Sequence, residues 1–498
     1  MTDLTELNSN QSNQMRELKV SLITFGCQMN EYDSEVASGL LEHQGFQLTP
    51  DEGAADVVLM NTCSVREHAE ERVYGRLGML GKVKKTNPNL IVGLMGCMVE
   101  EHRKKLFKRF PQLDFMIGTR NIRELPTLID EVIRTRKQIA KIKQDGISIE
   151  YTDLIKRGNP FHAWLPIMTG CDKVCTYCIV PITRGREVSM PAGGVYREAS
   201  RLVSEGVKWI TLLGQNVNSY RDENSTFVIK ESPKGVRKQS ERSEVASTSF
   251  DLTPPNDGCI RFPELLDTLC QIDGLERISF TTSHPHDASE ELFGVIARNH
   301  KVSRRFHLPL QSGSNRMLRR MKRLHTYEAY RDKIDVMRKM IPDISVTTDI
   351  ITGFSGETDE DHCDTIRALE EIRYDSAFIY KYSVRPATPA AKLPDDVPLA
   401  IKEKRNAELL KIQKQITNEN NRKWIGKTGH VFVEGINPKS KMEIDKVSCP
   451  PPFFSQLIGR TNQDKRVIFE GDQTSIGRFK KVELVALQHE TFIGRPAI

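Results

Sequence analysis

The sequence contains no run of about 18 apolar residues, which is the length that a membrane-spanning helix needs. Its first twenty residues, MTDLTELNSNQSNQMRELKV, also lack the basic start and apolar stretch of a secretory signal. We therefore expect a cytoplasmic protein with no membrane association. In that reducing compartment the ten cysteines should stay reduced, so clustered ones indicate metal ligands or reactive groups instead of disulfides.

The densest cysteine cluster lacks a fourth thiol. The stretch GCDKVCTYC, residues 170–178, contains Cys171, Cys175 and Cys178 with the spacing C-x3-C-x2-C. Structural zinc sites usually show paired C-x2-C halves and close with four ligands. A 4Fe-4S cluster has one ligand per iron, so three thiolates leave one iron open to a substrate or cofactor. The spacing therefore favours an iron–sulfur cluster with one vacant coordination position.

A second cysteine trio is spread along the N-terminal part. Three apolar, β-branched-rich runs, VSLITFGC, ADVVLMNTC and LIVGLMGC, end at Cys27, Cys63 and Cys97, and a fourth run, LDFMIG, follows. The stretches 31–45 and 66–85 between them have a helical pattern, which predicts a Rossmann-like α/β unit with buried parallel strands. Ligands bind beyond the carboxyl ends of such strands. We therefore expect these three cysteines to meet at one edge of the sheet.

A larger series of strand-like runs begins near residue 164. Its six runs, with helical segments such as 193–206 and 327–340 between them, predict a partial (β/α)6 barrel, whose active site lies at the C-terminal ends of the strands. The runs cover residues 164–171, 209–216, 277–284, 305–313, 346–354 and 376–383. Polar or glycine residues end most of them: Gln215, Asn216, Ser283, His284, Gln311, Ser312, Thr352 and Gly353.

Two further regions differ in composition. Residues 219–261 include a polar, Ser-rich stretch that cannot bury a core, and we interpret them as a flexible insertion. After a helical connector at 399–421, the short runs 428–435, 466–471 and 480–487 predict a small β-barrel. Residues 422–498 carry 13 Lys and Arg against 8 Asp and Glu, within a chain of net charge +6. Such a basic module suits a polyanion such as RNA.

Several motifs together carry a family resemblance: GCDKVCTYCIVPITRGRE, TLLGQNVNSY, FTTSHP, HLPLQSGSNRMLRRMKR, TDIITGFSGET and SVREHAEERV. With the N-terminal cysteine trio and the basic C-terminal module, they resemble the radical S-adenosylmethionine (SAM) methylthiotransferases that act on isopentenylated adenosine in tRNA. The resemblance covers roughly residues 18–493. It implies an N-terminal methylthiotransferase domain at 18–150, a radical SAM domain at 155–420 and a TRAM RNA-binding domain at 422–493. Residues 1–17 lie outside the pattern, and we expect them to be a disordered tail.

The resemblance also implies the cofactors. An auxiliary 4Fe-4S cluster matches Cys27, Cys63 and Cys97, and the SAM-binding 4Fe-4S cluster matches Cys171, Cys175 and Cys178. Such an enzyme transfers a methylthio group to C2 of N6-isopentenyladenosine at position 37, next to the anticodon. No side-chain base can remove the C2 hydrogen near neutral pH, so a radical is required. We expect the SAM contacts to come from Gln215, Asn216, Ser283, Gln311 and Gly353.

The expected partner is the tRNA anticodon stem-loop, whose single-stranded bases can leave their stack. An electron donor such as flavodoxin or ferredoxin and a sulfur donor or Fe-S assembly proteins would complete the system, with the enzyme as a monomer.

We interpret Cys259, Cys270, Cys363 and Cys449 as non-ligands and the imidazoles of His284 and His286 as ordinary. Phosphate contacts are expected from Arg184, Arg186, Arg319, Arg320, Lys322 and Arg323.

Two alternatives stay open on the residues alone. One keeps the chemistry and changes the substrate, to threonylcarbamoyladenosine in tRNA or to an aspartate of a ribosomal protein. The other belongs to a different class, a non-catalytic zinc-dependent RNA-binding protein. Iron content separates the second from an enzyme, and the identity of the modified product separates the first.

Overall fold

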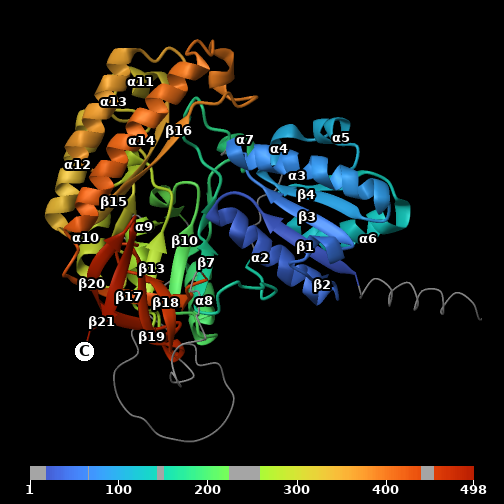
Figure 1. Cartoon of the computed structure of the whole chain (residues 1–498), viewed down its shortest axis with the longest axis horizontal. Coiled ribbons are helices and arrows are strands. Elements are labelled where there is room, and N and C mark those ends of the chain that lie inside the picture. The colour runs from blue at the N-terminus through green and yellow to red at the C-terminus, as the bar shows by residue number, and fades with distance from the viewer. Residues whose placement is uncertain (1–17, 65–66, 143–150, 224–257, 439–453, 498) are drawn as a thin grey trace, which may run out of the picture.

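The computed structural model describes residues 18–64, 67–142, 151–223, 258–438 and 454–497 (Figure 1). An N-terminal α/β domain lies beside a central barrel, and a small closed β-barrel lies below the central one. This arrangement confirms the predicted fold class. None of the helices in the described ranges is long and apolar enough to span a bilayer.

The N-terminal domain is built on a six-stranded sheet in the order β2-β1-β3-β4-β5-β6, with every pair parallel. All residues of β3 and β4 are buried, as their unbroken apolar runs predict. The four predicted runs are strands. Two additional edge strands, β2 and β6, were not predicted because they are only two and three residues long. The strands are β1 Lys19–Thr24, β2 Gln47–Leu48, β3 Val57–Thr62, β4 Ile91–Gly96, β5 Phe115–Ile117 and β6 Ile139–Lys141.

Helices cover both faces of this sheet. Apolar residues of α2 and α6 pack on one face, and those of α3, α4 and α5 pack on the other. The core beneath α2 also includes Leu213 and Trp164 of the central barrel, so this face joins the two domains. The helices are α2 Gln28–His43, α3 Glu67–Thr86, α4 Cys97–His102, α5 Lys105–Arg109 and α6 Leu125–Thr135.

The six predicted barrel strands are present as two parallel sheets, β7-β10-β13 and β14-β15-β16. A parallel bridge between Ile278 and Val302 continues the first sheet toward the second. Edge-to-face contacts among Phe262, Phe280 and Phe306, with ring centroids 5.2 and 5.5 Å apart, contribute to the core. The strands are β7 His162–Pro166, β10 Trp209–Leu213, β13 Arg277–Phe280, β14 Arg305–His307, β15 Ser345–Thr352 and β16 Ser376–Lys381.

Helices surround the barrel strands (Figure 1). The predicted helical segment at 327–340 is α12, with the same bounds, and the connector at 399–421 is the long α14. The helices are α7 Val180–Thr183, α8 Ala192–Ser204, α9 Phe262–Leu269, α10 Glu290–Arg298, α11 Asn315–Arg320, α12 Tyr327–Met340, α13 Asp359–Ile372 and α14 Leu399–Arg422. A short hairpin, β8 Met168–Thr169 with β9 Val188–Ser189, encloses the first barrel loop.

The C-terminal strands form a closed barrel in the order β17-β18-β19-β21-β20. It packs at the N-terminal ends of the central strands: Arg277, the first residue of β13, donates hydrogen bonds to the backbone oxygens of Arg460 and His430, at 3.1 and 3.4 Å. Strands β18 and β21 were not predicted. The strands are β17 Thr428–Ile436, β18 Phe454–Arg460, β19 Arg466–Asp472, β20 Phe479–Gln488 and β21 Thr491–Pro496.

The two ends of the predicted insertion lie next to each other. β11, Arg221–Asp222, pairs antiparallel with β12, Ile260–Arg261, so the chain leaves and re-enters the barrel at one place. The predictions for the tail at 1–17, for residues 224–257 and for Cys449 concern positions outside the described residues.

Candidate functional site: two cysteine trios at a domain boundary

The first cysteine trio lies at the carboxyl edge of the N-terminal sheet. Cys27 is the N-cap of α2, Cys63 directly follows β3, and Cys97 is the first residue of α4. Gly26 allows the close approach: it has φ +136°, and a Cβ atom there would lie 2.6 Å from Cβ of Cys63. The Asn30 amide donates to the side chain of Asn61 and to the Thr62 carbonyl, at 2.9 and 3.0 Å, which fixes the same edge.

The electrostatic environment of this trio favours a thiolate at Cys27. A hydrogen bond from Cys63 and, after it, the nearby charge of Arg184 lower the pKa of Cys27 to about 6, although burial opposes them. Burial raises the pKa of Cys97. Because the thiolate is the ligand form of cysteine, Cys27 is ready to bind a metal at neutral pH.

The second trio lies in the loop after the first barrel strand. Gly170 begins this loop with φ +75°, and a Cβ atom there would lie 1.9 Å from the Arg186 carbonyl oxygen, so no other residue fits. The Thr176 amide donates to the Met321 carbonyl at 3.0 Å, and Nη1 of Arg323 donates to Sγ of Cys175 at 3.5 Å. Burial raises the pKa of Cys171 to about 11 and that of Cys178 to about 12. These buried thiols need a cation before they ionise near neutral pH.

A buried arginine joins the two trios across the domain boundary. Arg184, six residues after Cys178, donates from Nη2 to Oδ2 of Asp33 on α2 at 2.7 Å, and both side chains are less than 10% exposed. The same guanidinium interacts with Cys97. Helix α7, which follows the second trio, packs against α4, which begins at Cys97. Both trios therefore face the same boundary.

The sulfur spacing fits clusters better than single ions. Within the described part of the chain, one group of three potential ligand side chains has its ligand atoms all within 4.8 Å of one another, and it contains no cysteine. Three thiolates around one zinc ion would have to lie that close, whereas a 4Fe-4S cluster spreads its thiolates over separate irons. All six cysteines are free thiols. The residues present therefore fit two iron–sulfur clusters.

The predicted SAM contacts lie at the C-terminal ends of the barrel strands. Oε1 of Gln215 accepts a hydrogen bond from the Gly170 amide at 2.6 Å, and the Asn216 amide donates to Asp287 at 2.7 Å. Gly353 has φ +72°, and a Cβ atom there would lie 2.3 Å from Cγ of Lys402. Gln311 adopts φ +78°, a strained conformation for a non-glycine residue that is typical of functional sites.

Several polar atoms at this end of the barrel are buried and have no hydrogen-bond partner among the described residues. Buried polar groups are nearly always paired, so these atoms suit a polar ligand such as the amino acid and nucleoside parts of SAM. They are Asn216 Oδ1, both amide atoms of Asn218, Ser283 Oγ, His284 Nε2, Gln311 Oε1 and Thr352 Oγ1.

Sequence reasoning did not single out Asn218 or Asp287, although QNVN and HPHD were visible signals. Asp287 accepts hydrogen bonds from Lys173 in the cysteine loop and from Asn216, and thereby links two strand ends. His284, interpreted as an ordinary imidazole, is buried, and its Nδ1 accepts from the His286 amide at 3.2 Å. Burial lowers the pKa of His284, so its imidazole is neutral.

The six predicted phosphate contacts differ in how far their side chains are exposed. Arg184 and Arg323 are each 8% exposed and contact the cysteine trios, so neither offers its guanidinium to a phosphate. This corrects the prediction for these two residues. Of the other four, Arg186, Arg319 and Lys322 are exposed, and Arg320 is partly exposed.

Two family descriptions match parts of the chain. Residues 19–118 match "Uncharacterized protein family UPF0004", and residues 165–369 match "Radical SAM superfamily". The first range contains the three N-terminal cysteines, and the second contains the C-x3-C-x2-C loop and the strand-end polar residues.

Curated relatives cover nearly the whole chain. A tRNA-2-methylthio-N(6)-dimethylallyladenosine synthase of Carboxydothermus hydrogenoformans is 39% identical over 94% of this chain and 97% of its own. The synthase of the same name from Pelotomaculum thermopropionicum is 41% identical over 95% and 97%. Among solved structures, the radical S-adenosylmethionine methyltransferase TsrM from Kitasatospora setae superposes with a TM-score of 0.49 at 13% identity, over 75% of this chain and 77% of that one.

Proposed function

The chain belongs to the tRNA-2-methylthio-N(6)-dimethylallyladenosine synthase (MiaB) family of radical SAM methylthiotransferases, and from this premise we propose which of its residues bind the clusters, SAM and tRNA. It is an enzyme that uses SAM and 4Fe-4S clusters to transfer a methylthio group to C2 of N6-isopentenyladenosine in tRNA. We assign the modified nucleoside to position 37, next to the anticodon.

The observation that carries this proposal is the position of both trios at one domain boundary, with Arg184 between them. Cys171, Cys175 and Cys178 would hold the SAM-binding cluster, and the N-terminal trio would hold the auxiliary one. When bound, these cofactors supply the one-electron chemistry and the methylthio group that the reaction needs. The buried ion pair between Arg184 and Asp33 crosses the boundary and would help to fix the two sites relative to each other.

The strand-end residues would bind and orient SAM. We propose Gln215, Asn216, Ser283, Gln311 and Gly353 for this role, and we add Asn218 because both of its amide atoms are buried and unpartnered in the described structure. The hydrogen bond between Gln215 and the Gly170 amide ties the cofactor end of the second strand to the cysteine loop. Because these contacts form before the reaction, the cofactor needs no further ordering next to the loop when the reaction occurs.

Three large apolar side chains near the cysteine loop support an isopentenylated substrate. Val174, Ile182 and Leu324 are 58%, 37% and 48% exposed, and each is within a few residues of Cys175, Cys178 or Arg323. The isopentenyl group is a branched hydrocarbon, whereas threonylcarbamoyl and aspartyl groups are charged. Exposed apolar surface of this kind favours the hydrocarbon substituent.

The tRNA contacts follow from exposure and position. We propose Arg186, Arg319, Arg320 and Lys322 as phosphate contacts, because the backbone of Arg320 and Met321 is hydrogen-bonded to Thr176 of the cysteine loop. The small β-barrel, proposed as a TRAM domain, packs at the opposite end of the central strands. A bound tRNA would therefore extend along the side of the central barrel, with its anticodon loop at the cysteine end.

Replacing Arg319 and Lys322 by glutamine together should weaken tRNA binding and leave the iron content unchanged. Each lost phosphate contact removes one released counterion, so the slope of log K against log salt should fall by about 1 to 2. Filter binding from low to moderate salt measures this slope. Arg367→Gln, on the exposed side of α13, is the control for loss of a single exposed cation elsewhere on the surface. An unchanged slope in the double variant would remove these residues from the interface.

Three supporting proposals concern the surroundings of the enzyme. A flavodoxin or ferredoxin would supply electrons, and a sulfur donor or Fe-S assembly proteins would replace the sulfur that is transferred. We further propose that the enzyme acts as a monomer in the cytoplasm, where its tRNA substrate is present and where ten cysteines stay reduced.

Anaerobic reaction of the reconstituted enzyme with SAM, a reductant and isopentenylated tRNA tests the function. Mass analysis of the digested nucleosides should show the mass of a methylthio group added to isopentenyladenosine. Parallel reactions with threonylcarbamoylated tRNA and with ribosomal protein should show no product. A colourless protein that contains zinc and no iron would instead support the non-catalytic RNA-binding alternative.

A further inference from the structure

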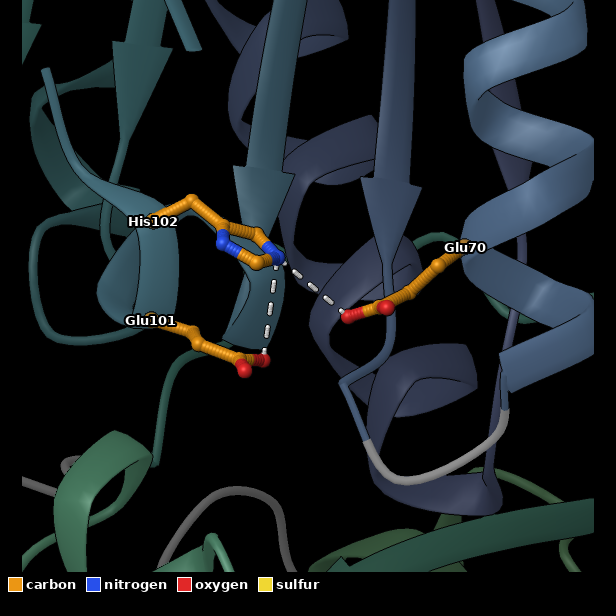
Figure 2. Close-up of side chains that lie close together, drawn as sticks. All are labelled: Glu70, Glu101 and His102. Carbon is orange, nitrogen blue, oxygen red and sulfur yellow. Dashed lines mark ion pairs between the residues drawn. The ribbon is translucent and has the colours of Figure 1, made fainter. Parts of the chain in front are cut away.

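A cluster of two carboxylates and one imidazole contains none of the six cysteines (Figure 2). Glu70 comes from α3, and Glu101 and His102 come from the end of α4. Nε2 of His102 is 3.5 Å from Oε1 of Glu70 and 3.9 Å from Oε2 of Glu101. The three ligand atoms all lie within 4.8 Å of one another. Figure 2 shows one ring nitrogen of His102 facing an oxygen of each carboxylate.

Three of the four carboxylate oxygens of this cluster have no hydrogen-bond donor among the described residues. The side chain of Glu101 is only 2% exposed, and neither of its oxygens has a hydrogen-bond partner among the described residues. Oε1 of Glu70 is also buried and unpartnered there. A buried carboxylate without a partner is costly, so each unsatisfied group calls for an explanation.

A fourth residue outside the cluster points to the same position. Ser64 is fully buried, and its hydroxyl has no hydrogen-bond partner in the described structure. Burial raises the pKa of the Glu101 carboxyl group, and the Ser64 hydroxyl, which lies beside that group, acts in the opposite direction. A ligand between α3 and α4 would therefore satisfy oxygens from three different segments of the chain.

Basic and neutral side chains surround the two carboxyl groups of the cluster. Nη1 of Arg385, from the central barrel, donates to Oε2 of Glu70 at 2.9 Å and neutralises one carboxylate. The hydroxyl of Tyr74 is 3.3 Å from Nε2 of His102 and brings no charge. A second guanidinium, that of Arg109, lies over the Tyr74 ring, 4.0 Å from its centroid.

The distances suit a transition-metal ion. Two ligand atoms about 2.1 Å from a tetrahedral zinc ion lie about 3.4 Å apart, close to the observed 3.5 and 3.9 Å. We propose that Glu70, Glu101 and His102 bind one divalent transition-metal ion of the zinc or manganese class, separate from the iron–sulfur clusters. The ion would tie α3, which follows Cys63, to α4, which begins at Cys97. It would also hold Glu70 in place for its contact with Arg385.

Manganese(II) titration of the reconstituted, oxidised holoenzyme tests this site independently of tRNA modification. Free aqueous Mn²⁺ gives a six-line electron paramagnetic resonance signal, which should disappear as about one ion per chain binds. Zn²⁺ should displace the manganese, because it binds nitrogen and oxygen ligands more tightly. The variants Glu101→Gln and His102→Gln should each weaken Mn²⁺ binding at least tenfold. Glu71→Gln, an exposed neighbour on α3, removes the same charge and should bind like the wild type.

The competing explanation is a protonated His102 that bridges the two carboxylates without a metal. In that case the free Mn²⁺ signal would persist with wild-type enzyme, and the proposal would be overturned. Equal Mn²⁺ affinity of Glu101→Gln and Glu71→Gln would overturn it as well, because the ion would then bind elsewhere. Iron analysis of each variant separates loss of this ion from loss of a cluster.

A second measurement tests the metal site even if the variants fail to fold. Mn²⁺ or Zn²⁺ should raise the melting temperature of the wild-type holoenzyme and of Glu71→Gln, because a ligand bound only by the native state stabilises it. No rise with either metal in the wild type would contradict the proposal without any variant. Failure of tRNA modification would leave these metal measurements unaffected, so the two proposals fail separately.

Discussion

Replacing Cys175 by alanine should abolish methylthio transfer, with a loss of at least about a thousandfold, because a cluster with one iron per ligand cannot keep its open site on two thiolates. Cys175 is the trio member that Arg323 contacts, and it lies centrally in the loop. The iron content should fall from about eight to about four per chain, since the N-terminal trio is untouched. Reductive SAM cleavage, followed by chromatography of 5′-deoxyadenosine, should be lost together with the methylthio product.

Cys363→Ala is the control for this variant, because Cys363 is an exposed free thiol on α13. It should keep the full iron content and activity. If Cys175→Ala retained SAM cleavage, the assignment of this trio to the SAM-binding cluster would be wrong. If Cys175→Ala lost all eight irons, the two trios would not be independent sites.

Replacing Arg184 by alanine should destabilise the protein by about 3 to 5 kcal/mol, because it leaves the buried Asp33 carboxylate unpaired. The pair joins α2 to the segment after the second trio, so the loss should also loosen the boundary between the domains. Urea unfolding under anaerobic conditions measures the change in free energy of unfolding. The midpoint should shift markedly, and the transition should begin with separation of the two domains.

Two variants control this experiment. Arg186→Ala removes a neighbouring arginine whose side chain is 84% exposed and paired with Asp172, and it should cost less than about 1 kcal/mol. The double variant Arg184→Met with Asp33→Leu removes both charges and should recover most of the loss, since an apolar replacement of a buried pair is often neutral. A similar small effect of Arg184→Ala and Arg186→Ala would show that the buried pair contributes little.

Arg184 also shows where sequence reasoning reached its limit. A basic residue just after a cysteine loop is a reasonable candidate for a phosphate contact, and nothing within TRGRE distinguishes Arg184 from Arg186. The distinction comes from Asp33, which is 151 residues earlier in the chain. Only the packing of α2 against the barrel determines which of the two arginines is buried.

The small C-terminal barrel shows a different limit. Its strands β17, β19 and β20 have apolar alternation that predicts them, whereas β21, TFIGRP, has two apolar side chains that no pattern separates from a turn. Barrel closure gives β21 its partners, a parallel one in β19 and an antiparallel one in β20. Strand pairing of this kind is a long-range property, which local periodicity does not contain.

The sequence by itself determined the two cysteine trios, the alternation of strands and helices and the polar strand ends, because cysteine spacing and apolar periodicity are local features that directly reflect ligand number and burial. The tertiary structure alone decided that Arg184 joins the trios, that Arg323 faces Cys175 and that Glu70 meets Glu101, His102 and Arg385. Each of these contacts depends on how separate surfaces of the molecule pack together. The energy of such contacts is set by burial and geometry between distant segments, which no single stretch of sequence specifies.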